Sequence, residues 1–221
     1  MENYEKVCRE DIFKKINSLD DEIVKSLAAP KGWTKDVDTL KEQIADFLLI
    51  CNIGNEDNLN IFEIGFGNGR STYLLTPFCK NITAIDAEPG GVRSWRNAGI
   101  ESIFKDQEVY KKINFHSNCK TIKQFMPSTY DAICFFKIAF LDHPKMNHLM
   151  SIDQFFKEMV YPLGEIRVML KTGGHLCLTL APEKSFNRSQ RSQKKYMTTL
   201  ENSHFKIVDH NRVDMIILEA V

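Results

Sequence analysis

The sequence has no long apolar run and no excess of charge of either sign. Lys plus Arg and Asp plus Glu number 29 each among 221 residues, so the formal net charge is zero. A protein that grips a long polyanion usually carries a basic excess. No stretch approaches the roughly 18 apolar residues of a membrane span, and the charged start Met1 to Glu5 has no apolar signal core. We therefore expect a cytoplasmic protein with no membrane partner and no extended nucleic-acid partner.

The sequence also lacks the signatures of metal and nucleophilic catalysis. Its six cysteines are scattered without a C-x-x-C pair, and its six histidines form no ligand spacing with them. No G-x-S-x-G serine elbow is present. Cys134 and Cys177 fall inside predicted buried strands, where a thiol behaves as a small hydrophobe. We therefore predict no metal site, reduced cysteines and a reducing compartment.

What the sequence contains is concentrated between Ile61 and Arg70, which read IFEIGFGNGR. The apolar run predicts a strand and the residues from Ser71 onward predict a helix, so a strand-to-helix turn lies between them. Three closely spaced glycines occupy this turn: Gly65, Gly67 and Gly69. The pattern is typical of a mononucleotide cradle. A dinucleotide fingerprint would have its third glycine at position 70, so Arg70 argues against a bound pyrophosphate and a nicotinamide dehydrogenase.

Two acidic residues flank this turn. Glu63 precedes the first glycine by two positions, and we expect its carboxylate to reach towards a cationic or hydroxylated part of the ligand. Asn81 to Asp86 predicts a second strand, and Asp86 follows Gly65 by about 20 residues, as a ribose-binding carboxylate should. Ribose hydroxyls would donate charge-assisted hydrogen bonds to that carboxylate.

These motifs carry a family resemblance. EIGFGNG followed by AIDAE is similar to the first two motifs of the class I S-adenosylmethionine-dependent methyltransferases. Tyr130 to Phe136 resembles that family's fourth strand, and Leu163 to Ala181 resembles its helix, Lys-x-Gly-Gly turn and fifth strand. The ordered set spans roughly Ile61 to Ala181. The resemblance implies an α/β, Rossmann-like class I methyltransferase fold. Its seven-stranded, mostly parallel sheet would end in an antiparallel hairpin and carry helices on both faces.

The resemblance also implies two parts of the chain. Residues 59–221 would form the S-adenosylmethionine-binding catalytic domain, and residues 1–58 an N-terminal helical segment. Apolar residues at helical spacing predict two helices there, one from Ile12 to Leu27 and one from Val37 to Leu48. Ser18 followed by Asp21 indicates a capped restart within the first. These helices are either a substrate lid or packing for the sheet.

The implied cofactor is S-adenosylmethionine, bound across the carboxyl ends of the first strands. The residues expected to bind it are Glu63, Gly65, Phe66, Gly67, Asn68, Gly69, Asp86, Ala87, Asn118 and Phe136. Phe66 and Phe136 are either cation–π partners of the sulfonium or core residues. Asn118 departs from the family, which often has Asp there. An amide oxygen can still accept the adenine amino group, and a turn-forming role is the alternative.

The sulfonium of this cofactor makes its methyl group electrophilic, so direct in-line transfer needs positioning rather than a nucleophile or metal. His143 and Asp142, after the fourth strand, are the candidate general base and its partner. The alternative is that they only turn the chain into the next helix. We expect a small-molecule or peptide acceptor. Transfer of an aminopropyl or carboxylated group, or a non-catalytic binding protein, are the other possibilities, and the sequence leaves the oligomeric state open.

Overall fold

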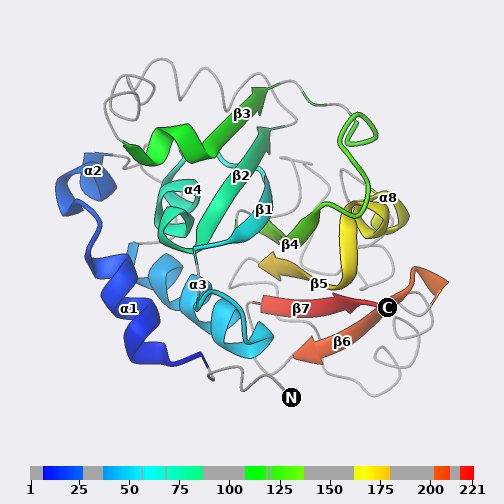
Figure 1. Ribbon diagram of the computed structural model, residues 1–221, viewed down its shortest axis with the longest axis horizontal. Coiled ribbons are helices and arrows are strands. Elements are labelled where there is room, and N and C mark those ends of the chain that lie inside the picture. Colours follow the sequence, from blue (N-terminus) through cyan, green and yellow to red (C-terminus); the bar gives the residue numbers. More distant parts are fainter. Residues whose placement is uncertain are drawn as a thin grey trace, which may run out of the picture.

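The centre of the molecule is a mixed β-sheet (Figure 1). The computed structural model describes residues 7–26, 37–55, 57–67, 69–86, 108–117, 119, 121–136, 162–179, 202–209 and 215–221. Within these residues the sheet has seven strands in the order β3-β2-β1-β4-β5-β7-β6. The strands are β1 (Leu59–Ile64), β2 (Cys79–Asp86), β3 (Ile113–Ser117), β4 (Tyr130–Phe135), β5 (Leu170–Thr179), β6 (Phe205–Asp209) and β7 (Met215–Ala220).

The strand directions confirm the predicted topology. The first five strands all run parallel, with β1 between β2 and β4. β7 is antiparallel to both β5 and β6, so it alone is reversed among the described strands. Since parallel neighbours end at the same edge of a sheet, the carboxyl ends of β1, β2 and β4 lie together, where ligands of open α/β sheets bind.

The expected Lys-x-Gly-Gly turn proves to be a bulge inside β5. Tyr130 pairs with Leu170 and Ala132 with His175, so residues 171–174 of β5 lie opposite a single residue of β4. Gly173 has φ +76° there, a left-handed conformation that glycine adopts without strain. The extra residues bend the strand while pairing continues on both sides. The fifth strand therefore already begins at Leu170 and contains the expected turn within it.

Helices cover both faces of the sheet, as predicted. They are α1 (Arg9–Asn17), α2 (Asp21–Ser26), α3 (Val37–Cys51), α4 (Arg70–Leu75) and α8 (Leu163–Met169), with short 3₁₀ turns η1 (Thr76–Phe78) and η2 (Glu108–Lys112). The restart between α1 and α2 uses a different cap from the one expected. Asp20 accepts hydrogen bonds from the backbone N–H of Glu22 at 2.8 Å and Ile23 at 3.4 Å. Ser18 instead donates its hydroxyl to Lys15 O at the end of α1.

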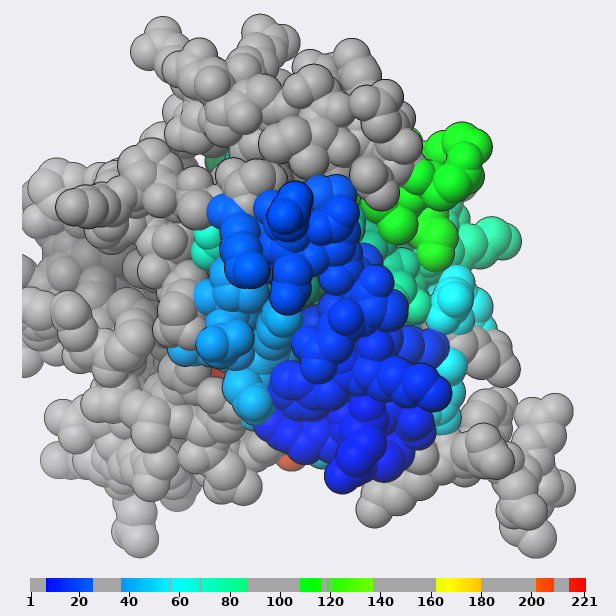
Figure 2. Space-filling model, turned by 90° about the vertical axis from the view of Figure 1, so that its left-hand side faces the viewer, coloured from blue at the N-terminus to red at the C-terminus, as the bar shows by residue number. Residues whose placement is uncertain are grey.

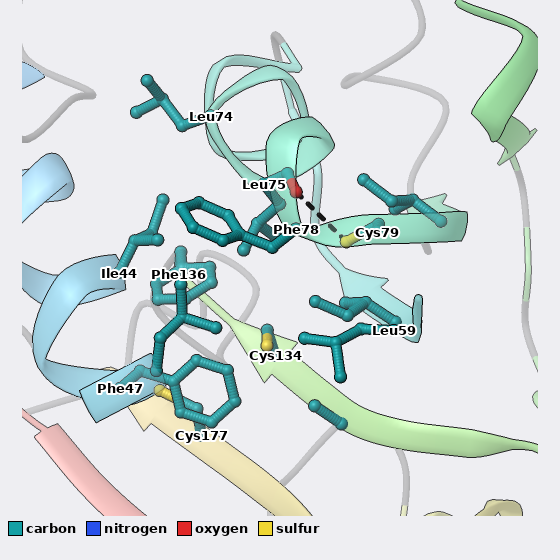
Figure 3. Close-up of a cluster of buried hydrophobic side chains, with 14 of the residues drawn as sticks. Ile44, Phe47, Leu59, Leu74, Leu75, Phe78, Cys79, Cys134, Phe136 and Cys177 are labelled. Atoms are coloured by element: carbon teal, nitrogen blue, oxygen red, sulfur yellow. Dashed lines mark hydrogen bonds between the residues drawn. The ribbon is translucent and has the colours of Figure 1, made fainter. Parts of the chain in front are cut away.

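Alternation along β1 separates two apolar cores, because successive side chains of a strand point to opposite faces. Ile61 belongs to the core beneath α1 to α4, whereas Phe62 belongs to the core beneath α8. Figure 3 shows the first of these, where the ring of Phe47 from α3 lies beside Cys177 of β5. The same alternation places Glu63 on the α4 side of the sheet.

The N-terminal helices share this core with the sheet. Ile12 and Ile16 of α1 and Ile44 of α3 are buried in the same cluster as Ile61. Arg9 of α1 forms ion pairs with two carboxylates of α3, Glu42 and Asp46. In Figure 2 the atoms of α1 and α2, with the lighter blue atoms of α3, form a continuous surface over this side of the molecule. The described helices thus pack onto the sheet, and a lid function for the segment stays a prediction.

All six cysteines are free thiols. Burial raises the pKa values of Cys51, Cys79 and Cys134 above their ordinary range. Cys79 also donates its thiol to Leu75 O, the contact drawn in Figure 3. Among the described residues, no helix combines the length and apolar character that a membrane crossing requires.

The bulge in β5 generates a matched pair of glycine substitutions. A Cβ at Gly174 would lie 2.9 Å from Lys171 O and 3.2 Å from Asp131 O, whereas one at Gly164 in α8 would meet nothing within 4 Å. We expect Gly174→Ala to lower the free energy of unfolding by about 1–3 kcal/mol. Gly164→Ala should leave it unchanged or raise it by up to about 1 kcal/mol. Urea unfolding monitored by circular dichroism measures both, and equal stabilities of the two variants would contradict the bulge geometry.

Thiol reactivity tests the core. The thiolate is the reactive form, so buried thiols with raised pKa values should stay unmodified at mildly alkaline pH. Cys8 is partly exposed, and the other five cysteines are buried. We expect one thiol per native chain to react rapidly with a chromogenic disulfide reagent, and all six to react in denaturant. Rapid native labelling of several thiols would show that the core is open.

Candidate active site

The turn between β1 and α4 takes its shape from its three glycines. Gly65, Gly67 and Gly69 have φ values of +77°, +53° and +76°. Side chains with a Cβ adopt this left-handed region at a cost, which explains the alternate glycines in the sequence. The turn lies at the carboxyl end of β1, beside the end of β2, and leads directly into the first turn of α4.

The backbone N–H groups of this glycine loop (residues 65–69) point back into the protein. Gly65 N donates to Ile85 O at 2.8 Å, which extends the β1–β2 ladder by one bond, and Phe66 N lies 3.4 Å from the same oxygen. Gly67 N donates to Asp86 Oδ2 at 3.3 Å. Gly69 N donates to Phe66 O at 2.8 Å. The described N–H groups of the loop are therefore engaged within the chain.

The described carbonyl groups of the loop fall into two pairs. Phe66 O and Gly69 O accept hydrogen bonds from Gly69 N and Tyr73 N. Within the described part of the chain, no hydrogen bond reaches the carbonyl oxygen of Gly65 or Gly67. The described part of the loop thus presents two carbonyl acceptors, which suit a ligand that carries hydroxyl or ammonium groups.

Asp86 meets the loop as the sequence predicts. It is the last residue of β2, its side chain is 8% exposed, and its carboxylate accepts the Gly67 N–H. Its backbone oxygen accepts a hydrogen bond from Cys119 N at 3.2 Å, which ties the chain beyond β3 to the same edge. An ionised carboxylate has about four lone-pair sites, so the contact with Gly67 is compatible with further hydrogen bonds to ligand hydroxyls.

Glu63 contacts α4. Its side chain is 1% exposed, and one carboxylate oxygen accepts the hydroxyl of Ser71 while the other accepts that of Thr72 at 2.5 Å. The expectation that this carboxylate reaches past the turn to a ligand stays a prediction. The sequence held a signal for the observed contact, because alternation along β1 puts Glu63 on the side of the helix that follows.

Phe66 and Phe136 are both core residues. The Phe66 ring, 2% exposed, meets the Phe115 ring edge-to-face with centroids 5.1 Å apart. Phe136 follows β4, and its ring lies edge-on to Phe47 of α3 with centroids 6.2 Å apart. These geometries are typical of aromatic packing. Figure 3 shows Phe136 between Phe47 and Phe78 in the core.

Five predicted site residues lie outside the described part of the chain: Asn68, Ala87, Asn118, Asp142 and His143. Their proposed roles stay predictions. Within the described part, no group of three or more His, Cys, Asp or Glu side chains is placed to hold a metal ion. Arg70, at the position where a dinucleotide fingerprint has glycine, begins α4 with a buried side chain, and burial lowers the pKa of its guanidinium.

Solved structures share this architecture. The precorrin-6y C5,15-methyltransferase of Geobacter metallireducens GS-15 superposes with a TM-score of 0.54 at 13% identity, over 88% of this chain and 94% of that one. An S-adenosylmethionine-dependent methyltransferase of Aquifex aeolicus gives a TM-score of 0.51 at 16% identity, over 91% and 98% of the two chains. The chain has the class I methyltransferase fold. The predicted Rossmann-like sheet with its terminal reversed strand is confirmed.

Sequence comparison adds a short match. Over 78 residues the chain is 28% identical to Nodulation protein S of Sinorhizobium fredii strain NBRC 101917 / NGR234, covering 35% of this chain. The match spans 36% of that protein, about a third of its length. No protein-family model matches the chain.

Proposed function

We propose that this protein is an S-adenosylmethionine-dependent methyltransferase that transfers the methyl group directly, in line, to a small-molecule or peptide acceptor. The observation that carries the proposal is the polarity of the glycine loop. Its described N–H groups are engaged internally, the carbonyl oxygens of Gly65 and Gly67 accept no hydrogen bond from the described residues, and the Asp86 carboxylate lies against the loop.

This polarity fits the proposed cofactor better than a phosphate-bearing one. Phosphate cradles aim backbone N–H groups at the anion. Here the N–H groups of Gly65 and Gly67 are already bonded to β2, and the buried carboxylates Glu63 and Asp86 flank the loop. Acidic side chains beside a phosphate would be unfavourable. A ligand with ribose hydroxyls and an ammonium group would instead find acceptors at Asp86 and at the loop carbonyls.

The protein's own task in this reaction is to hold its ligands in place. The cofactor supplies an electrophilic methyl group, so the chain needs to orient the acceptor, which alone can contribute roughly 7–11 kcal/mol. Asp86 and the loop carbonyls would fix the cofactor. His143 would take a proton from acceptors that are protonated at working pH, with Asp142 orienting it. The helices of residues 1–58 would enclose the acceptor.

Two alternatives use the same fold. One is transfer of an aminopropyl or carboxylated group from a related sulfonium, and the other is a non-catalytic protein that retains the sheet. Release of S-adenosylhomocysteine distinguishes methyl transfer from both. A screen of small amines, carboxylates, hydroxylated metabolites and short peptides, read out by that product, would identify the acceptor class.

Asp86→Ala tests the cofactor site, with Asp131→Ala as a matched control. Asp131 also accepts a backbone N–H, from Asn60 at 2.8 Å. It lies near the start of β4, at the amino ends of the parallel strands and away from Asp86. We expect Asp86→Ala to weaken S-adenosylhomocysteine binding by about 1–3 kcal/mol and Asp131→Ala to leave it unchanged. Isothermal titration calorimetry measures both.

Two outcomes of this titration contradict the proposal. One is equal affinity of the Asp86→Ala and wild-type proteins for S-adenosylhomocysteine. The other is wild-type binding of NAD with no binding of S-adenosylmethionine or S-adenosylhomocysteine. The second outcome would show that the glycine loop binds a dinucleotide.

His143→Ala tests the proposed base. Since His143 would act on the acceptor, we expect its removal to lower the turnover number by about 10²-fold or more and to leave cofactor affinity unchanged. Turnover is measured by S-adenosylhomocysteine release with the acceptor found in the screen. A fully active variant would remove His143 from the mechanism.

A further inference from the structure

The two ends of the glycine loop are joined by side chains. Glu63 lies two residues before Gly65, and Ser71 lies two residues after Gly69. The Ser71 hydroxyl donates to Glu63 Oε1, and the Thr72 hydroxyl donates to Glu63 Oε2 at 2.5 Å. We call this three-residue contact the loop clasp. It spans the loop from the end of β1 to the first turn of α4.

The clasp is buried, so its hydrogen bonds contribute more to stability than exposed ones would. Glu63 is 1% exposed, Ser71 5% and Thr72 0%. A low local dielectric strengthens the hydrogen bonds that buried groups make. Removing one hydroxyl would leave a buried carboxylate oxygen with less compensation, so the ends of the loop would have to shift.

Two other described side chains also contact the loop: the Phe66 ring packs on Phe115, and the Asp86 carboxylate accepts the Gly67 N–H. Gly69, at the N-cap position of α4, has φ +76° and no side-chain capping bond. The three glycines contribute no side chains to packing. The described backbone hydrogen bonds of the loop run from the N–H groups of Gly65 and Phe66 to Ile85 O, and from Gly69 N–H to Phe66 O. The clasp ties the end of β1 directly to the first turn of α4, so it constrains how the loop between them is presented.

We infer that Ser71 and Thr72 are positioning residues for the cofactor, acting through Glu63 and without touching the ligand themselves. The inference rests on the proposed function and deepens it, because it assigns Glu63 to shaping the loop rather than to direct contact. Ser71 and Thr72 keep the Glu63 carboxylate turned towards α4, and the acceptor oxygens of Gly65 and Gly67 are presented as a result.

Affinity for S-adenosylhomocysteine, measured by calorimetry on the full chain, tests this inference. Ser71→Ala and Thr72→Val each remove one hydroxyl donor from Glu63. We expect each to raise the dissociation constant by about tenfold or more. Thr72→Ser keeps the hydroxyl and should stay within about twofold of wild type.

Thr76→Val is the matched control for a purely structural effect. Thr76 is fully buried at the other end of α4 and donates its hydroxyl to Tyr73 O at 2.7 Å. We expect this variant to lose thermal stability yet to bind S-adenosylhomocysteine like wild type. Ser71→Ala deletes a single oxygen atom, so it decides the question if Thr72→Val does not fold.

The outcomes separate this inference from the proposed function. Wild-type affinity in Ser71→Ala and Thr72→Val, with only a lower melting temperature, would overturn the positioning role while leaving the methyltransferase proposal intact. Failure of the wild-type protein itself to bind S-adenosylhomocysteine or S-adenosylmethionine would overturn both.

Discussion

The architecture of the site depends on how the glycine loop closes onto the end of β2. Gly65 N extends the parallel ladder to Ile85 O, and Gly67 N turns to the Asp86 carboxylate. Because both donors point inward, the loop does not offer them to an anion, and the Asp86 carboxylate and the carbonyl oxygens of Gly65 and Gly67 are acceptors at that edge. Glycine at alternate positions makes this geometry possible, since each of the three has a positive φ that other residues adopt only with strain.

The strand that leads into the loop, β1, lies between two apolar cores, one on each face of the sheet. On one face, α1 and α3 pack with α4 over Ile61 and its neighbours, and on the other, α8 packs over Phe62. Glu63 therefore emerges on the α4 side within a water-excluded layer, where its only favourable environment is a set of hydrogen-bond donors. Ser71 and Thr72 supply them. The contact of Glu63 with Ser71 and Thr72 thus links the sheet to its first crossover helix. It follows from the alternation along β1, from the burial of Glu63 and from the helix that comes next in the chain.

Much of this was predictable from sequence because the patterns are local. The apolar run before the glycines and the segment Asn81 to Asp86 predicted β1 and β2, and the family resemblance indicated β4, each within about two residues at each end, an ordinary error for such boundaries. The spacing from Gly65 to Asp86 predicted that the two would meet. Features that depend on contacts between separate segments were not predicted. The β5 bulge depends on the pairing register with β4, which the sequence of one strand does not show. The cap of α2 was also missed, because the spacing of Ser18 and Asp21 suggested Ser18, whereas Asp20 makes the capping bonds. The partners of Glu63 were missed because hydroxyls at a helix start suggest capping rather than a strand carboxylate.

The central claim is that the glycine loop, with its N–H groups turned inward, receives an adenosyl ligand through Asp86 and its own carbonyls. A crystal structure with S-adenosylhomocysteine tests it most directly. The account predicts ribose hydroxyls at hydrogen-bonding distance, roughly 2.6–3.0 Å, from the Asp86 carboxylate, with the Gly65 to Ile85 bond kept and Glu63 still held by Ser71 and Thr72. A ligand bound elsewhere, or a loop whose N–H groups turn outward to hold it, would contradict the account.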